Sequence, residues 1–487
     1  MTKTLEDGRK DILYTAVQQT QQEEQLKKLG EELTRPLPII GARHIQALIL
    51  LALGVIAFGA RAFLSVAIVA MTDAKANPNP DIPTYPEWTD KSVILSAFFW
   101  GYILSQAFGG WAANQYGPKW FLVVSMGIGS ILGFLVPTVA ANFGSKGVMA
   151  IRALQGLSQG FVFPSIHYLL SQWAPLSERS RMGAFIMAGA PLGTVIALSV
   201  TGFLAASPYG WPMVFYFYSA LGFVWCVIMA IFGHNSPAEH PSISVAEKFF
   251  IENSLGHAEH KKKHPTPWKE IITSPPIWAL LIAQSGFSFV FYVLLTQIPS
   301  YLNHVMKFDI KNNSLISSLP YLALFVLSFI FSTVSDAIIN KKILSVGKAR
   351  KSFNAIGMIV PAVALIALGY TRQDQTTRAV ILMILAVGFL SAGLSGWGVN
   401  HIDLSPNHAG TLMGLLSTVA NSFAIVAPIM TQFIVTDQEN VTQWRTIFIV
   451  SAVGNIAVTL VFSVFGSGKI QPWNEEREDS GSDKPRP

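Results

Sequence analysis

Charged residues are scarce in this chain, and their scarcity excludes an ordinary soluble protein. Only 13% of the 487 residues are Asp, Glu, Lys or Arg, whereas 51% are hydrophobic. A typical soluble domain is about 25% charged. The charges lie mostly in short blocks between long uncharged runs. Because Lys and Arg lie at the ends of those runs, the net charge of +6 indicates membrane topology and not nucleic-acid binding.

Cysteine is almost absent as well. The single residue, Cys226, cannot form an internal disulfide, and no cysteine metal cluster can be built. The chain also lacks a P-loop, a glycine-rich dinucleotide motif and a nucleophile paired with a base. We therefore expect no enzyme, no cofactor and no pump with its own nucleotide-binding domain. The polar first forty-odd residues contain no short apolar region, so no cleavable signal peptide is expected.

Long apolar runs, by contrast, are abundant. A run of about 20 apolar residues can cross a bilayer as a helix. We read twelve such runs and predict an all-α membrane protein with twelve transmembrane helices. The runs start near Gln46, Ser92, Lys119, Gly147, Arg181, Trp211, Ile277, Ser314, Ser352, Ala379, Ala409 and Val441.

A long polar stretch separates the sixth run from the seventh and divides the chain into two halves. The predicted parts are a cytoplasmic tail (1–44), an N-terminal six-helix half (45–233), a cytoplasmic central loop (234–276), a C-terminal six-helix half (277–466) and a second cytoplasmic tail (467–487). In the central loop, Ser244 and Glu247 match a capping box. This pattern predicts a short amphipathic helix that connects the halves.

Basic residues in short loops set the orientation, because they favour the cytoplasmic side. Most loop Lys and Arg residues fall on one side of the predicted topology, which places both termini in the cytoplasm; Arg372 and Arg378 are exceptions. The opposite side carries two glycosylation sequons, at Asn312 and Asn440, whose closeness to the membrane can leave either one unmodified. The cytoplasmic basic residues are Lys119, Arg179, Arg181, Lys261, Lys262, Lys263, Lys341, Lys342, Lys348, Arg350 and Lys351.

An arginine lies inside the fourth run, where a cation is costly and so marks a candidate functional site. Arg152 is followed by Gln155 and Gln159, and on a helix these three side chains lie on nearly one face. No acid lies beside them, so the charge is available to an anion. The alternative is a structural role, in which Arg152 donates hydrogen bonds to backbone carbonyls between helices.

A second cation, Arg61, lies past the middle of the first run, towards the non-cytoplasmic side. A lone membrane arginine can reach the interface with its long side chain, although here roughly ten residues separate it from the loop. The planar guanidinium group matches carboxylate and phosphate oxygens in pairs. Two buried arginines without acidic partners therefore predict an anionic ligand.

Four further polar residues are candidates for coupling or gating. His167 lies further along the stripe of Arg152 and is either a hydrogen-bonded histidine at a helix end or a proton relay. Asn400, His401 and Asp403 close the tenth run. A gate or ion site and simple termination of the helix explain that cluster equally well.

The remaining candidates concern the lining of a cavity and helix packing. Tyr292 and Gln297 lie in the seventh run, where they either line a cavity or pack between helices. Gly156 and Gly160 form a G-x-x-x-G pair, which predicts close approach of two helices.

The loop after the second run resembles the loop motif of the major facilitator superfamily, G-G-x-x-A-D-R-x-G-x-R/K. Here it reads G-G-W-A-A-N-Q-Y-G-P-K. The acid and base of the motif are replaced by Asn114 and Gln115, which bears on its gating role and not on the fold. The residues that match the motif are Gly109, Gly110, Gly117 and Lys119.

Other patterns resemble one branch of that superfamily, the anion transporters that include sialin, the vesicular glutamate transporters and the sodium-phosphate cotransporters. They run from R-A-F-L-S-V-A-I-V-A-M at Arg61, through Q-W-A-P-L-S-E-R-S-R at Gln172, to V-N-H-I-D-L-S-P-N-H-A-G-T-L-M-G at Val399. The resemblance implies a binding site near the midplane between the two halves. It also implies that Arg61 and Arg152 help to coordinate the anion.

Departures from the branch bear on coupling. Sialin-like members carry titratable glutamates where Gln155 and Gln159 stand, and the vesicular glutamate transporters carry an arginine where Phe287 stands. Glutamines at these positions resemble the phosphate and organic-anion members, particularly the invertebrate proteins labelled inorganic phosphate cotransporters.

These features predict a secondary active transporter of a phosphate or carboxylate-bearing anion, coupled to sodium and working by alternating access as a monomer. Gln155 and Gln159 would orient the anion or the helix. One alternative is a proton-coupled lysosomal or vesicular carrier of acidic sugars or acidic amino acids, in which His167 or His401 moves protons. Another is an anion sensor or scaffold that does not transport. The plasma membrane is one predicted location; a tyrosine-based sorting pattern at Tyr14 is compatible with vesicles or lysosomes.

Overall fold

The computed structural model describes residues 38, 40–74, 79–175, 178–256, 266–406 and 408–474. For residues 107–116, 179–180 and 410 it describes the backbone alone. The basic run 261–263 and the sorting pattern at Tyr14 lie outside the described residues.

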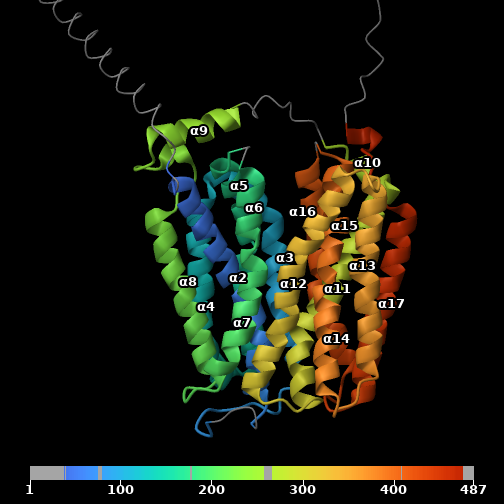
Figure 1. Cartoon of the computed structure of the whole chain (residues 1–487). Helices are drawn as coiled ribbons and strands as arrows, with labels where there is room; N and C mark the ends of the chain where they lie inside the picture. Colours follow the sequence, from blue (N-terminus) through green and yellow to red (C-terminus); the bar gives the residue numbers. More distant parts are fainter. Residues whose placement is uncertain are drawn as a thin grey trace, which may run out of the picture.

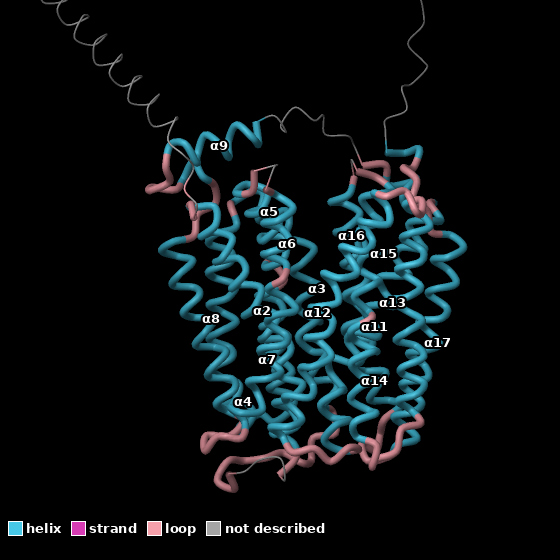
Figure 2. Tube along the Cα trace, in the orientation of Figure 1, coloured by secondary structure: helices cyan, strands magenta, loops and turns pink. Residues whose placement is uncertain are grey.

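Every regular element in the described ranges is a helix (Figures 1 and 2). The first half contains α2 (Ala42–Thr72), α3 (Lys91–Tyr116), α4 (Pro118–Gln159), α5 (Val162–Trp173), α6 (Arg179–Met187), α7 (Gly189–Ala205) and α8 (Pro212–Phe232). The second half contains α11 (Pro275–His304), α12 (Ile310–Asn340), α13 (Val346–Gly369), α14 (Thr376–Gly388), α15 (Leu390–Leu404), α16 (Ala409–Ile434) and α17 (Val441–Phe465). The short helices are η1 (Pro237–Glu239), α9 (Val245–Gly256) and α10 (Trp268–Thr273) between the halves, and η2 (Pro472–Asn474) after α17.

These helices make the twelve predicted crossings. Ten described stretches are long and apolar enough to span a bilayer. One of them, Pro118–Trp173, makes two crossings, because the chain turns back at Gly144 (φ 61°, ψ −154°), a conformation that glycine adopts without steric cost. The 26-residue α3 supplies the twelfth. The prediction of an all-α protein with twelve membrane helices is therefore confirmed.

The crossings begin within a few residues of the predicted positions. α16 and α17 begin at Ala409 and Val441, as predicted, whereas α13 begins at Val346 and not near Ser352. The first turns of α13 contain the basic stretch 348–351. Those residues form helix but interrupt the apolar pattern, so hydropathy alone places the start too late.

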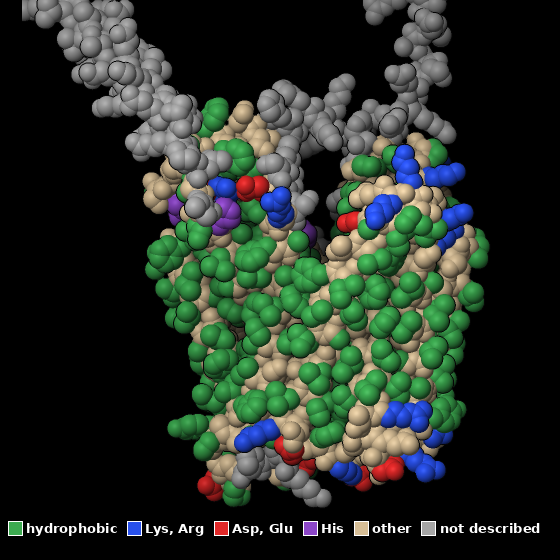
Figure 3. All heavy atoms as spheres, in the orientation of Figure 1, with side chains coloured by type: hydrophobic (Ala, Val, Ile, Leu, Met, Phe, Trp, Pro, Cys, Tyr) green, Lys and Arg blue, Asp and Glu red, His purple; other side chains and the backbone are tan. Residues whose placement is uncertain are grey.

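The two halves form adjacent bundles (Figures 1 and 2). Across their boundary α12 packs on α7, α16 on α3, and α11 on α2. Hydrophobic side chains cover the outer surface in a broad belt, and charged side chains gather at its two ends (Figure 3). Such a belt fits the hydrocarbon core of a bilayer. We call the end that carries α9 and α10 the α9 end, and the other the sealed end.

The two halves are hydrogen-bonded to each other at the sealed end. Ser314 on α12 accepts from the backbone N–H of Gly202 on α7 (2.8 Å). The Asn303 amide of α11 donates to Asp73, which follows α2 (2.9 Å). These bonds join the bundles on the side away from α9.

α9 is fixed to the first half. Half of the predicted capping box forms: the Glu247 backbone N–H donates to Ser244 Oγ (3.2 Å). The Glu247 carboxylate instead accepts from the backbone N–H groups of Ala42 (3.0 Å) and Arg43 (3.2 Å). It also forms an ion pair with the Arg43 guanidinium at 2.8 Å, and Glu178 forms another at the same distance. The predicted short helix thus lies between the halves, and its acid also caps the N-terminus of α2.

Gly156 and Gly160 on α4 allow α3 to pack at backbone distance, as the G-x-x-x-G pair predicts. A Cβ on Gly156 would overlap the carbonyl oxygen of Phe98. A Cβ on Gly160 would lie 2.7 Å from the carbonyl oxygen of Tyr102. Both carbonyls belong to the α3 backbone, which cannot move aside as a flexible side chain can. The contact fixes the position of α3 against α4.

We therefore expect Gly156→Ala to destabilise the protein by about 1–3 kcal/mol, the usual cost of overpacking. Thermal unfolding of the purified protein in detergent measures it. Gly454→Ala on α17 is the matched control, since a Cβ there meets no atom within 4 Å, and alanine is the better helix former. Equal melting temperatures for the two variants would contradict the close contact.

Candidate functional site

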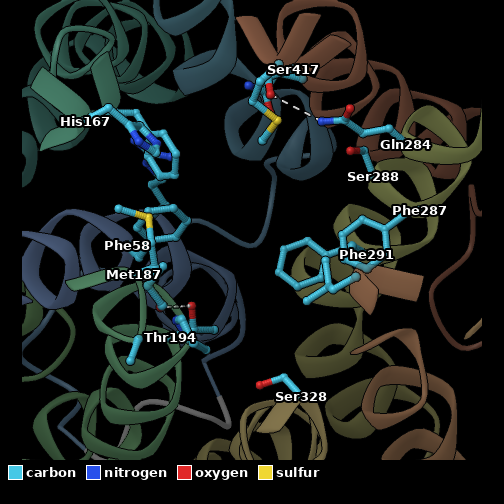
Figure 4. Close-up of a pocket in the computed structure, with 18 of the residues that line it drawn as sticks. Phe58, His167, Met187, Thr194, Gln284, Phe287, Ser288, Phe291, Ser328 and Ser417 are labelled. Carbon is cyan, nitrogen blue, oxygen red and sulfur yellow. Dashed lines mark hydrogen bonds between the residues drawn. The ribbon is translucent and has the colours of Figure 1, made fainter. Parts of the chain in front are cut away.

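A cavity of about 1020 Å³ lies between the two halves. Residues of α2, α3, α5, α6 and α7 line one wall, and residues of α11, α12, α15 and α16 line the other. Figure 4 shows Phe58, His167, Met187 and Thr194 facing Gln284, Phe287, Ser288 and Phe291 across it. A notch between the halves at the α9 end marks its mouth (Figure 3). The cavity is therefore open at the α9 end and closed at the other.

Aromatic side chains dominate the lining. Phe287 stacks on Phe291, with ring centroids 5.8 Å apart, and packs against Trp397 at 5.0 Å. Such a wall suits an apolar or ring-shaped group. The aromatic residues of the lining are Phe58, Tyr102, Phe163, Tyr168, Phe287, Phe291, Tyr292, Tyr321, Phe325, Phe329 and Trp397.

Among the described lining residues, Arg61 is the single Lys or Arg, and none is Asp or Glu. Three rings surround its guanidinium carbon, with centroids 4.4 Å (Tyr102), 4.6 Å (Phe58) and 5.3 Å (Phe98) away. Ring faces attract a cation, which holds the group at membrane depth. Its buried Nε and Nη2 nonetheless have no hydrogen-bond partner. Arg61 is thus a cation held in place without a counter-ion in the part of the chain that the structure describes.

Arg152 does not line this cavity, so the two predicted arginines do not face one space in this conformation, and a role of Arg152 in coordinating the anion stays a prediction. Arg152 is 3% exposed and lies in a separate pocket of about 30 Å³ inside the first half. Its guanidinium carbon lies 5.0 Å from the centroid of the same Phe98 ring that Arg61 contacts. Its Nη1 donates to Gln155 Oε1 (3.0 Å) and to the Ala60 carbonyl (3.3 Å). Phe98 and these bonds retain Arg152 within the bundle.

The two glutamines share the small pocket with Arg152. Gln155 also donates to the Gly129 carbonyl (3.1 Å) and so ties the two arms of α4 together. Gln159 is 4% exposed, and its Oε1 has no partner. Both side chains are placed to orient Arg152 and the helix, whereas contact with a ligand in the large cavity would require rearrangement.

Tyr292 and His167 both line the cavity. For Tyr292 this is one of the two positions that the sequence left open. Tyr292 packs edge-on against Phe99 (4.8 Å), and His167 lies beside Phe163 (5.3 Å; Figure 4). Gln297 does not line it: its amide donates to Ser92 on α3 (3.3 Å), nearer the sealed end.

Several neutral polar residues of the cavity were missed by the reading of the sequence. Gln284 donates to Ser417 (3.3 Å; Figure 4), and Asn421 donates to Gln106 across the two halves (3.1 Å). Ser288 lies one helical turn from Gln284. On α11 and on α16 these residues are four positions apart, and that periodic polar face inside apolar runs is the signal that could have found them.

Two residues of the predicted loop motif, Gly117 and Lys119, lie where α3 passes into α4. Gly117 has φ 76°, which favours glycine, and the Lys119 backbone N–H donates to Asn235 Oδ1 (2.9 Å) within the first half. Gly109 and Gly110 lie in the helical backbone of α3, and their side-chain surroundings are outside the described residues. The gating role of all four stays a prediction.

The cluster at the end of α15 joins parts of the second half. Asp403 forms an ion pair with Arg350 of α13 (2.7 Å). Asn400 donates to Asp403 (3.4 Å) and to the Ser467 carbonyl (2.8 Å), and His401 is half-buried beside them. These contacts fit the termination of α15, and a coupling role stays a prediction.

The sequence of residues 49–428 matches the family model of the Major Facilitator Superfamily. The chain belongs to this superfamily. It is accordingly a membrane transporter and not an enzyme. In the described residues, each half crosses the membrane six times, and the cavity lies between the two halves.

Relatives extend the match along most of the chain. The Drosophila melanogaster protein named "Putative inorganic phosphate cotransporter" is 38% identical over 449 residues, which cover 87% of this chain and 84% of that protein. Human sialin is 33% identical over 441 residues, covering 86% and 88%. The resemblance to the branch that includes these proteins is therefore confirmed.

A solved structure shows the same fold. It is a bacterial homologue of the human lysosomal transporter Spinster in an inward-facing and occupied conformation, with a TM-score of 0.66 and 13% identity. The likeness covers 86% of this chain and 95% of that one. At this identity it supports the fold alone.

The division into a large cavity and a separate pocket predicts different reactivity of introduced thiols. With the single cysteine replaced (Cys226→Ser), Ser288→Cys lines the cavity, whereas Ser219→Cys lines the pocket of Arg152. We expect a membrane-impermeant thiol reagent applied from the α9 end to modify the first variant and not the second, because the large cavity has room for the reagent and the pocket of about 30 Å³ does not. Mass spectrometry of the intact protein measures the labelling. Equal modification would mean that the two spaces are connected.

Proposed function

We propose that this protein is a secondary active transporter of an organic or inorganic anion, coupled to sodium and working by alternating access. The observation that carries the proposal is Arg61, a cation that lines the central cavity without an acid among the described lining residues. The names of its relatives, a phosphate cotransporter and sialin, support an anionic substrate.

A bound anion would accept hydrogen bonds from the Nε and Nη2 groups of Arg61, which have no partner among the described residues. A buried ionisable side chain in a membrane protein is costly and marks a substrate pathway by default. Carboxylate and phosphate oxygens pair with the planar guanidinium group. Arg152 would add positive potential from the small pocket, since interactions between charges remain strong where water is excluded. Arg61 would contact the anion, and Arg152, held by Gln155, would support it at a distance.

Alternating access would break the contacts at the sealed end while the α9 end closes. The bonds to be broken include Ser314 to Gly202 and Asn303 to Asp73, together with that from the Val93 N–H to Gln432 (3.2 Å). Each is a neutral bond or a bond to one charged group, with a net value of about 0.5–3 kcal/mol. Such a seal is weak enough to open when the two bundles rock about the site.

The distribution of basic residues indicates how the protein is oriented in the membrane. Basic residues favour the cytoplasmic side, and several lie at the α9 end, including Lys341, Lys342 and Lys348. We place that end, and both termini, in the cytoplasm, so the cavity faces inward in this conformation. The protein would act as a monomer in the plasma membrane or in a lysosomal or vesicular membrane.

A proton-coupled carrier is the second candidate, and His167 favours it. The histidine points into the cavity and is the one histidine among its described lining residues (Figure 4), and an imidazole is a side chain suited to carrying protons. Sodium coupling instead draws support from Gln155 and Gln159, which cannot titrate where sialin-like members carry glutamates.

Uptake by the purified chain in proteoliposomes tests the role of Arg61. We expect Arg61→Gln to lower anion affinity by about 10- to 100-fold, because a hydrogen bond to a charged group is worth about 1.5–3 kcal/mol. Phosphate, urate, glutamate and sialic acid are the tracers, each with and without sodium. Arg372→Gln, an exposed change outside the cavity lining, is the control. Unchanged uptake in Arg61→Gln would remove the anion site from the cavity, and tight binding without flux would indicate a sensor.

Imposed gradients separate the two coupling ions. With an inward sodium gradient and no pH difference, we expect uptake above the equilibrium level, and His167→Gln should retain it because sodium coupling does not use an imidazole proton. Accumulation driven by a pH gradient alone, lost in His167→Gln, would support the proton-coupled carrier instead.

A further inference from the structure

We propose that the cargo is an organic anion with a single negative charge, a flat apolar body and a neutral polar group at its far end, and that inorganic phosphate is a poor fit. This inference rests on the proposed function, because it takes Arg61 as the anion site. It narrows the ligand from anions in general to one shape and one charge.

The charge of the cargo follows from the balance of charge in the cavity. Arg61 is the single Lys or Arg among the described lining residues, and no carboxylate offsets it. Arg152 lies in the separate small pocket, where it donates to Gln155 and to Ala60. It favours negative charge in the cavity only at a distance, so the second charge of a dianion would have no cation to contact among the described lining residues, which is expensive. The one charge of a monoanion pairs with Arg61.

The residues that line the cavity indicate that the body of the cargo is apolar. Beyond Arg61, the surface that a ligand meets is mainly the aromatic set named above, together with Met187, Leu324, Leu394 and Met413. A phosphate ion among these rings would lose its hydration shell and gain few hydrogen bonds, at a large cost. A ring-shaped body would instead bury apolar surface against the nearly parallel rings of Phe287 and Phe291 (interplanar angle 12°).

The wall opposite Arg61 indicates that the far end of the cargo carries a neutral polar group. On the second half, Gln284 and Ser288 of α11 face the cavity next to Ser417 of α16 (Figure 4). Gln284 and Ser417 are hydrogen-bonded to each other at 3.3 Å, a long bond that a ligand hydroxyl could replace. These groups are amides and hydroxyls without charge, so they suit a neutral donor or acceptor. The volume of about 1020 Å³ accommodates a ligand that reaches from Arg61 to this group.

A matched series of ligands tests charge and shape separately. The probes are 4-hydroxybenzoate, benzoate, terephthalate and inorganic phosphate, and binding to the full chain in lipid nanodiscs is measured by calorimetry. Terephthalate has the same ring with a second carboxylate in place of the hydroxyl. We expect 4-hydroxybenzoate to bind best, benzoate less well, and terephthalate and phosphate at least about tenfold more weakly, as an uncompensated charge requires.

Two variants assign the parts of the site. Gln284→Leu should lower the affinity for 4-hydroxybenzoate more than that for benzoate, so that their ratio falls towards one. Phe287→Arg places a second cation on the opposite wall and should shift the preference from 4-hydroxybenzoate to terephthalate. Thermal unfolding checks that each variant is folded. A ratio that Gln284→Leu leaves unchanged would overturn the polar subsite.

The outcomes separate this inference from the proposed function. Phosphate binding tighter than 4-hydroxybenzoate, with loss of binding in Arg61→Gln, would overturn the cargo class while the anion transporter stands. No binding by any of these probes or by the tracers named above would overturn both. Tight binding of 4-hydroxybenzoate that Arg61→Gln leaves intact would place the anion elsewhere and also overturn both.

Discussion

The cation–π contacts around Arg61 are the interaction on which the central cavity depends. A guanidinium group at this depth needs either a counter-ion or a polar surrounding. Here the ring faces of Phe58, Phe98 and Tyr102 surround the group, and none of the described residues that line the cavity is an Asp or Glu. Rings attract the cation more weakly than an acid would. The positive charge is therefore stabilised enough to remain in the fold and still available to a ligand.

Phe98 connects this contact to the packing of the first half. Its ring meets Arg61 on one helix and Arg152 on another, and its backbone carbonyl lies where a side chain on Gly156 would be. A glycine on α4 thus lets α3 approach until one aromatic ring lies 5.3 Å from the Arg61 guanidinium and 5.0 Å from that of Arg152. Arg61 lines the large cavity and Arg152 the small pocket, so one ligand does not contact both in this conformation. The close approach of α3 to α4 therefore positions the ring that both cations contact.

The sequence predicts well what depends on local pattern and poorly what depends on how helices face each other. Hydropathy finds the starts at Ala409 and Val441, because an apolar run and a helix coincide there. Arg152, Gln155 and Gln159 do share one face of α4, as their i, i+3, i+7 spacing predicts. That spacing does not say whether the face points to the central cavity or to another helix of the same half. Glu247 shows the same limit: a capping box is a local rule, and the N-terminus of α2, two hundred residues away, competes successfully for the carboxylate.

The two walls of the cavity differ in charge, and that asymmetry bears on how binding could close it. The first half supplies the cation, whereas the second supplies aromatic rings, an amide and hydroxyls. A ligand shifts a conformational equilibrium only by its difference in affinity for the two states. An anion that touches Arg61 alone binds one half and gains little when the bundles move together. A longer ligand that also reaches Gln284 and Ser417 gains contacts as the α9 end closes, so its length, as much as its charge, couples binding to the motion.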